Sequence, residues 1–507
     1  MRLHEVHVLS APLKPAVGLS GTANIGTLAL LTLAVLLIHG YHPFAEDAEI
    51  YIAGVRKLAD SSLYQTDAPF VLVNTHLSLF AHLGAEILRI TRIPLDWLLL
   101  LTHLGLIFAF LFASWMLAGR IFTSSPAQWS AVILSAAFFS LPLAGTSLML
   151  MDPYITARSF TTPLSLFALA AAIDQRWIQT ALLLLLTGFM HPLMAIYAAA
   201  FILLFILIDL GHTRLALILA ALDFIVCGAI YLATLHAPIS SAWRQALLSR
   251  NYLFPSEWAW FEYLGLAVPL LMYAYAFRRL GIYPLTGKLC LAAIMLGTSS
   301  SLAAFVFVHP SGPYLLASLQ LLRAFHILYL LGIILLGGLI GHTLWTKPIR
   351  RPAACAIMAA VALAMFITAH LTYPASNHIE LPGLTSRNPW QQAFLWIRTN
   401  TPRDAVFAAN PDLVLLRGED GQSFRVMTGR SLLADYKDGG VAVVFPGLAP
   451  RWATEYNAQN GIDRLSDTER LDRLRPLGVT WLLLSRDAAT SFPCPWHNSV
   501  AQVCRLP

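Results

Sequence analysis

Residues 23–49 read ANIGTLALLTLAVLLIHGYHPFAEDAE. The first part of this stretch is apolar and uncharged, and Glu46 and Asp47 follow it within ten residues. The run at 23–38 is apolar enough for a membrane helix, and no small-x-small cleavage pattern follows it. We therefore expect an uncleaved signal-anchor helix rather than a removed signal peptide. The leader before this helix contains two basic residues, Arg2 and Lys14.

The composition of the chain divides near residue 374. Of the 507 residues, 57% are hydrophobic and 12% are charged, whereas about a quarter of a soluble protein is charged. Residues 375–507 carry 14 basic and 13 acidic side chains, and residues 1–374 carry 19 and 14. This contrast predicts a polytopic α-helical membrane domain at 1–374 and a soluble α/β domain at 375–507. It excludes a purely soluble enzyme, a fibrous protein and a disordered protein.

Eleven apolar segments are candidates for transmembrane helices. They lie at about 23–38, 95–118, 127–149, 160–173, 178–190, 192–209, 213–236, 258–277, 285–308, 313–343 and 352–373. The three between 160 and 209 are short for a hydrocarbon core of about 30 Å. Short spans are tolerated where protein or a cavity surrounds them.

Basic residues indicate how these segments are oriented. We expect residues 75–91 to lie on the membrane surface, because they contain His76, His82, Glu86 and Arg89. One set of later loops then holds Arg120, Arg176, Arg214, Arg278, Arg279, Lys288, Lys347, Arg350 and Arg351, and the opposite set holds Arg158, Arg244 and Arg250. The positive-inside rule therefore predicts a cytoplasmic N-terminus. The loops 41–94, 150–159 and 237–257 and the C-terminal domain would be outside the cytoplasm.

Local patterns predict the elements of the C-terminal domain. Asn388 and Pro389 open a helix with Trp390, Phe394 and Ile397 on one stripe. A capping box at 466–469 starts a second helix that Gly478 ends. Strands are expected at 405–409 and 479–485. Cys494 and Cys504 are close enough to bridge a hairpin if the domain is exported, and Cys227, Cys290 and Cys355 lie in apolar runs and are expected to be packing residues.

The acidic residues of the first loop are candidates for catalysis. Pro43 can start a helix with Ala48, Ile52, Val55 and Ala59 on an apolar face, with Glu49 on another face and with Glu46 and Asp47 in its first turn. Such a helix would lie at the membrane interface. A general base acting on a sugar or lipid hydroxyl must be an ionised carboxylate, and the helix N-terminus favours that form. Simple capping of the helix is the alternative.

Four polar residues in or beside the predicted spans are further candidates. Arg158 could clamp a phosphate, or it could snorkel or pair with Asp152 to close the second loop. Arg323 and His326 share one helix face inside a span, where ionisable residues are commonly functional. His191 lies between two short spans, and a structural role is the more common one for a histidine beside a proline.

Arg425 and Arg430 belong to charged stretches at 423–430 and 434–438 around short strands. These stretches could face the membrane and bind a lipid headgroup. They could equally be solvated residues at a strand edge, which is the commoner case.

The order of several short motifs resembles a known superfamily. The motifs are ARSF at 157–160, MHPL at 190–193, WIRTNTP at 396–402 and RSLLAD at 430–435. Together with the acidic pair after the first span, the short middle spans and the C-terminal α/β domain, they resemble the GT-C superfamily of membrane glycosyltransferases, in a bacterial branch whose members mostly lack a known substrate.

This resemblance implies a sugar transfer outside the cytoplasmic membrane of a bacterium. A polyprenyl-phosphate sugar would be the donor, a lipid, glycan or protein would be the acceptor, and membrane lipids would surround the enzyme, without a nucleic-acid partner. Asp47 would be the base, with Glu46 as its substitute, and inversion would occur at the anomeric carbon. Arg158 and Arg323 would hold the leaving phosphate, and His191 would line the cavity. The substrate-binding set we expect is Glu49, Asp152, Arg158, His191, Arg323, His326, Arg425 and Arg430.

Other readings of the sequence stay open. No metal ligands are assigned, although Glu46, Asp47 and Asp152 could contribute to a divalent cation site, which would need more oxygen ligands than these. A flippase or transporter of a lipid-linked saccharide is one alternative function, but it predicts internal repeats that the sequence lacks. A non-catalytic scaffold subunit with a GT-C fold is another.

Overall fold

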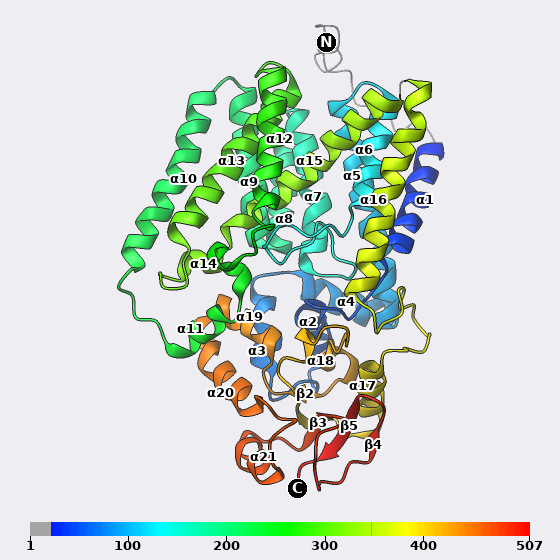
Figure 1. Ribbon diagram of the computed structural model, residues 1–507, viewed down its shortest axis with the longest axis vertical. Coiled ribbons are helices and arrows are strands. Elements are labelled where there is room, and N and C mark those ends of the chain that lie inside the picture. Colours follow the sequence, from blue (N-terminus) through cyan, green and yellow to red (C-terminus); the bar gives the residue numbers. More distant parts are fainter. Residues whose placement is uncertain (1–21, 346) are drawn as a thin grey trace.

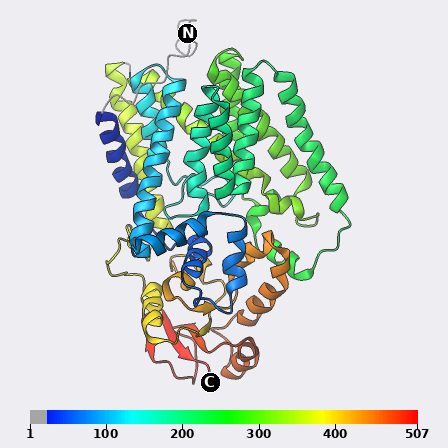
Figure 2. The same ribbon diagram turned by 180° about the vertical axis from the view of Figure 1, so that it is seen from behind.

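The computed structural model describes residues 22–345 and 347–507, so Arg2 and Lys14 of the leader lie outside the described residues. The chain is mostly helical (Figures 1 and 2). A bundle of long helices occupies one end of the molecule, and the C-terminal α/β region, residues 375–507, occupies the other. The first loop lies between them.

Each of the eleven expected spans contains a helix. These helices are α1 (Thr22–His39), α5 (Leu95–Ile121), α6 (Ser125–Ala137), α7 (Ala157–Ile173), α8 (Trp177–Met190), α9 (Pro192–Asp209), α10 (Thr213–Thr234), α12 (Leu264–Leu280), α13 (Leu285–Phe307), α15 (Phe325–Ile340) and α16 (Arg351–Thr372). Within the described residues, six helical segments are long and apolar enough to cross a membrane, or seven if one bent pair is a single span. Helices α1, α7 and α8 are apolar but shorter. The bundle therefore fits a multi-pass membrane protein, and the number of crossings stays a prediction.

The expected span at 127–149 is wrong in its second half. Helix α6 ends at Ala137, and residues 138–156 form an irregular loop. The loop is apolar because protein covers it: Leu143, Leu148 and Leu150 are all buried. Irregular backbone of this kind is tolerated near a membrane when it is enclosed by protein. Gly145 lies so close to the ring of Trp258 that a Cβ atom would meet it at 2.4 Å.

The expected span at 313–343 is broken near its start. Helix α14 (Leu315–Leu319) ends at Gln320, whose φ of 52° is left-handed, and a 3-10 turn η5 (Leu321–Ala324) leads into α15. Arg323 lies in this turn rather than inside a continuous helix. Helix α14, which directly precedes this turn, lies at the end of the bundle that faces the C-terminal region (Figure 1).

The first loop contains four short helical segments: α2 (Ala48–Ala59), α3 (Ala68–Leu72), η2 (Val73–His76) and α4 (Phe80–Thr91). The segment Ala68–His76 is bent by 104° against α4. The apolar face predicted for α2 is buried, but Glu49 is also buried, because α2 packs between α4 and the C-terminal region. Glu46 and Asp47 lie in the turn before α2, not inside its first turn.

The C-terminal region is a small mixed sheet with helices on both faces. Its helices are α17 (Pro389–Asn400), α18 (Phe424–Thr428), α19 (Tyr436–Val444), α20 (Ala449–Gln459) and α21 (Asp467–Leu474), and its strands are β1 (Val406–Ala408), β2 (Ser431–Leu432), β3 (Trp481–Ser485), β4 (Trp496–His497) and β5 (Ala501–Arg505). The strand order is β2-β1-β3-β5-β4. Strand β1 is parallel to β2 and β3, and β5 is antiparallel to β3 and β4.

Alternate residues of each strand enter two different cores. Phe407 and Leu483 pack with α17, whereas Ala408 and Leu482 pack toward α21. The predicted helices and strands of this region are confirmed. The Asn388 side chain accepts from the backbone N–H groups of Trp390 and Gln391 and so caps α17, and the predicted capping box starts α21.

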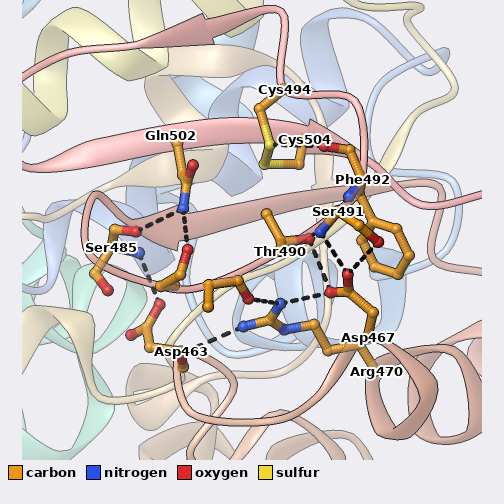
Figure 3. Close-up of a disulfide and its surroundings, with 12 residues drawn as sticks. Asp463, Asp467, Arg470, Ser485, Thr490, Ser491, Phe492, Cys494, Gln502 and Cys504 are labelled. Atoms are coloured by element: carbon orange, nitrogen blue, oxygen red, sulfur yellow. Dashed lines mark hydrogen bonds and ion pairs between the residues drawn. A yellow bond between two sulfur atoms is a disulfide. The ribbon is translucent and has the colours of Figure 1, made fainter.

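Cys494 and Cys504 form a disulfide that closes a hairpin next to strand β5 (Figure 3). The three other cysteines are free, and Cys227 and Cys290 are buried as expected. The expectation for Cys355 is wrong, because this residue is exposed on the surface of α16.

We expect three thiols to react with maleimide in the unfolded, non-reduced protein and five after reduction, as counted by mass spectrometry. Replacing both bridging cysteines by alanine should destabilise the C-terminal region by about 3 kcal/mol, because the crosslink limits the unfolded chain. Cys355→Ala is the matched control and should leave the melting temperature unchanged. Five reactive thiols before reduction would contradict the pairing.

Candidate active site

Asp47 is the point at which three segments of the chain meet. Its Oδ2 accepts a hydrogen bond of 2.8 Å from Nη1 of Arg158, in the first turn of α7. Its Oδ1 accepts one of 3.1 Å from Nζ of Lys437, in the first turn of α19. The carboxylate thus joins the first loop, the bundle and the C-terminal region. The Asp47 side chain keeps 27% of its surface exposed, so a ligand can reach it.

Glu46 shares Lys437 with Asp47. The Lys437 ammonium also donates to the Glu46 carboxylate, and the Glu46 backbone N–H donates to the side-chain oxygen of Gln422. Glu46 has a φ of 48°, a left-handed conformation that is uncommon for a residue with a side chain. This turn directs both acidic side chains toward Lys437.

Arg158 lies between two carboxylates. The capping box of Thr156 and Ser159 starts α7 and fixes the position of Arg158 at the helix N-terminus. Nη2 of Arg158 lies 3.2 Å from Oδ2 of Asp152, so the pair that would close the second loop is formed. Asp47 joins the same guanidinium from the first loop.

Arg323 is half-buried near this cluster, and no carboxylate of the described residues forms an ion pair with it. Its Nε has no hydrogen-bond partner among the described residues. It lies close enough to Arg158 and Asp47 for their charges to act on it. Two small cavities flank the cluster. Arg323, Gln320 and Trp258 are among the residues that line one of them. Asp152, Arg158 and His326 are among those that line the other.

The two histidines in the predicted site have backbone contacts. Nε2 of His326 lies 3.0 Å from the carbonyl oxygen of Leu150 and so anchors the irregular second loop to α15. His191 is the N-cap of α9, where its Nδ1 accepts from the Met194 N–H at 3.5 Å. This is the structural role that is common for such a histidine. The charges of Arg158 and Arg323 nevertheless act on His191, so it lies beside the cluster.

Arg425 is not a solvated residue at a strand edge, which was one of the two alternatives that the sequence left open. Its guanidinium is 2% exposed and donates to Asp67 of the first loop and to Asp438, the latter at 2.6 Å. Glu49 lies 3.8 Å away and completes the ring of acids around Arg425. Arg425 therefore fastens the C-terminal region to the first loop through Asp67, and it also binds Asp438, the residue that follows Lys437 in α19.

Arg430 lies outside the Asp47 cluster. Its guanidinium donates to the backbone carbonyl oxygens of Arg398 and Thr401 at the C-terminal end of α17. Those carbonyls have no partner inside the helix, and a buried cation there also complements the helix dipole. Every group that Arg430 binds belongs to the C-terminal region, and the expectation that it contacts the substrate stays a prediction.

The local charges fix the ionisation of the central pair. Burial alone would raise the pKa of Asp47, but the charges of Lys437 and Arg158 outweigh it and hold this pKa well below its usual range. Burial alone would lower the pKa of Lys437, but Glu46 and Asp47 outweigh it and raise this pKa above its usual range. Asp47 is therefore a carboxylate and Lys437 an ammonium over the whole physiological pH range.

The acidic residues do not fit a divalent cation in this arrangement. Lys437 stands between Glu46 and Asp47, and Arg158 stands between Asp47 and Asp152. The described part of the chain contains no group of three His, Cys, Asp or Glu side chains that could hold a metal ion. A hard cation needs six or more oxygen ligands, which these side chains do not offer together.

Reasoning from the sequence missed Asp67 and Gln422, and it included Lys437 only as part of the charged stretch at 434–438, not as a site residue. A signal existed for Lys437. Asp435 and Asp438 form a capping box, which predicts a helix start and places Lys437 in its first turn. No local pattern says that this first turn meets the first loop, because the contact joins residues 390 positions apart.

The chain can be compared with protein families, with curated proteins and with solved structures. Residues 388–444, which include Gln422, Arg425, Arg430 and Lys437, match a domain family described as a domain of unknown function (DUF6798). No curated protein matches the chain. Among solved structures, the chain is similar to the archaeal oligosaccharyltransferase AglB from Archaeoglobus fulgidus, in complex with an inhibitory peptide and a dolichol-phosphate. The identity is 12% and the TM-score 0.43, over 92% of this chain and 69% of that chain. A likeness at this level carries no functional conclusion.

Replacing Arg425 by methionine should destabilise the protein by about 3–5 kcal/mol, because Asp67 and Asp438 would stay buried without their cation. The melting temperature of the full chain in detergent measures this loss. Arg398→Ala is the matched control, because the Arg398 side chain is exposed and only its carbonyl contacts Arg430. Equal melting temperatures for the two variants would contradict a structural role for Arg425.

Proposed function

We propose that this protein transfers a sugar from a polyprenyl-phosphate donor to an acceptor hydroxyl at the outer face of a bacterial cytoplasmic membrane. Asp47 is the general base. The acceptor oxygen attacks the anomeric carbon and gives its proton to the Asp47 carboxylate. The bond between this carbon and the phosphate oxygen breaks on the opposite side, so the configuration inverts and polyprenyl phosphate leaves.

One observation carries this proposal. An accessible carboxylate of the first loop contacts Arg158, and the guanidinium of Arg323 lies nearby with an Nε that has no hydrogen-bond partner among the described residues. Two guanidinium groups near each other repel, and an anion bound by both would offset the repulsion. A phosphate suits such a site, because guanidinium groups bind phosphate oxygens through parallel hydrogen bonds.

The position of the cluster suits a lipid-linked donor. The cluster lies where the apolar helices meet the C-terminal region, so an isoprenoid chain could lie along the bundle while its phosphate reaches the cations (Figure 1). The basic residues of the loops predict that this end of the bundle faces away from the cytoplasm. Nucleotide sugars are cytoplasmic, and a donor anchored in the membrane is the one that remains available there.

Asp47→Asn should lower the transfer rate by about 10²- to 10⁴-fold, because the amide cannot accept the proton. The protein in nanodiscs is supplied with synthetic polyprenyl-phosphate sugars, and released polyprenyl phosphate is measured. Asp60→Asn is the matched control, since Asp60 is an exposed carboxylate of the same loop that bonds Ser62. Turnover by Asp47→Asn at the wild-type rate would remove Asp47 from the mechanism. Movement of the lipid-linked donor across the membrane of vesicles, without transfer of its sugar, would instead favour a flippase.

Arg323→Gln should weaken the binding of polyprenyl phosphate by roughly tenfold or more, because one charge-assisted hydrogen bond is lost. Native mass spectrometry or competition with a photoreactive polyprenyl phosphate measures the affinity. Arg244→Gln is the control, because Arg244 is an exposed residue of α11 (Ser241–Leu248). Equal affinity for Arg323→Gln and wild type would exclude Arg323 from the phosphate site. Binding of polyprenyl phosphate without any sugar transfer would favour the alternative of a non-catalytic scaffold subunit.

A further inference from the structure

We propose that Lys437 is a built-in cation of this site, whose ammonium takes the place that a divalent metal ion would need between Glu46 and Asp47. The first loop then needs no metal ion, and Lys437 positions Asp47 for its task. The catalytic part of this inference rests on the proposed sugar transfer. The statement about metal binding stands on the geometry alone and is tested separately.

The contacts of the Lys437 ammonium carry the first step. Nζ donates to a carboxylate oxygen of Glu46 and, at 3.1 Å, to one of Asp47. The Lys437 side chain is 12% exposed, so protein rather than water surrounds most of it. A single cation that bridges two adjacent carboxylates weakens their mutual repulsion and fixes their relative orientation. That is the structural role a bound metal ion has in an acidic site.

A divalent ion would have to displace an existing cation to bind here. Both oxygens of Asp47 are engaged, one by Lys437 and the other by Arg158. Asp152 is the nearest further carboxylate of the cluster, and the Arg158 guanidinium separates it from Asp47. An ion placed among these groups would lie within a few ångströms of two positive charges, and it would be repelled by both.

The lysine is held in place from several directions. The capping box of Asp435 and Asp438 sets the N-terminus of α19, and Asp438 is held in turn by Arg425. On the other side, the guanidinium of Arg250, from the loop after α11, stacks 3.4 Å above the ring of Tyr436, the residue before Lys437. Lys437 is therefore a fixed part of the site and not a mobile surface lysine.

The close approach of Arg250 to α19 requires a glycine. A Cβ atom at Gly439 would lie 2.7 Å from Nη2 of Arg250 and 2.9 Å from the ring of Trp452. Gly439 and Lys437 both lie within the matched segment 388–444. This segment thus contains the lysine that completes the acidic site, the arginine that docks it onto the first loop and the glycine that lets a neighbouring loop hold it.

Manganese titration of the full-length protein in nanodiscs, followed by electron paramagnetic resonance, tests the metal statement without any substrate. Wild type should bind no Mn²⁺ at this site below about 1 mM. Lys437→Gln should bind Mn²⁺ at least about tenfold more tightly, because it removes the competing charge and keeps both carboxylates. The double variant Lys437→Gln, Asp47→Asn should lose this gain.

Lys57→Gln is the matched control, because Lys57 belongs to the same loop and its ammonium donates to the backbone carbonyls of Ser61 and Leu63. It should bind Mn²⁺ as weakly as wild type. Binding of Mn²⁺ to wild type that Asp47→Asn abolishes would overturn the inference. The comparison of wild type with Asp47→Asn tests the inference even if Lys437→Gln fails to fold. A folded Lys437→Gln that binds Mn²⁺ no better than wild type would also overturn it.

Turnover separates this inference from the proposed function. Wild type that transfers sugar should keep its rate within about twofold in excess EDTA, because no step uses a metal ion. Loss of turnover in EDTA that Mn²⁺ restores would overturn the inference while leaving sugar transfer intact. Absence of any transfer would refute the proposed function, and the manganese titration would still decide whether Lys437 is the resident cation.

Discussion

The contact of Asp47 with Arg158 and Lys437 is the interaction on which the organisation of the molecule depends. It joins a turn of the first loop, the start of α7 and the start of α19, which are far apart in the sequence. Each segment ends or begins a helix at that point, so backbone capping and side-chain charge act together. Any shift of the C-terminal region relative to the bundle separates Lys437 from Asp47, and the charges of the site depend directly on how these two parts dock.

The buried ring around Arg425 explains how the docking is kept in register. A buried ion pair adds little net stability compared with apolar residues, because both charges lose their hydration. The ion pairs do disfavour any other docking of the C-terminal region onto the first loop, because such docking would leave a buried charge without its partner. Asp67 and Glu49 come from the first loop, whereas Asp438 comes from α19 beside Lys437. The ring therefore fixes the position of the lysine through polar specificity rather than through the apolar core.

Local patterns predicted much of the fold but little of the assembly of the site. The capping residues Asn388 and Ser466 identify α17 and α21, because capping depends on neighbours within a few residues. The apolar loop at 138–156 was mistaken for part of a span, since burial in protein and burial in lipid select the same residues. Asp47 and Arg158 were chosen for their positions after spans. Lys437 was not chosen, because only tertiary docking brings it to Glu46 and Asp47.

The paired state of Asp47 has a consequence for any reaction at this site. A carboxylate bound to two cations is a poor base, because its proton affinity is reduced by both charges. An incoming phosphate competes with Asp47 for Arg158, since both are oxygen anions that bind a guanidinium. A phosphate that drew Arg158 toward itself would deprive Asp47 of one cation and make it a stronger base. Lys437 stays in place and keeps the carboxylate oriented. In the proposed transfer, basicity at Asp47 would therefore rise when a phosphate is bound, which would couple deprotonation of the acceptor to occupancy of the donor site.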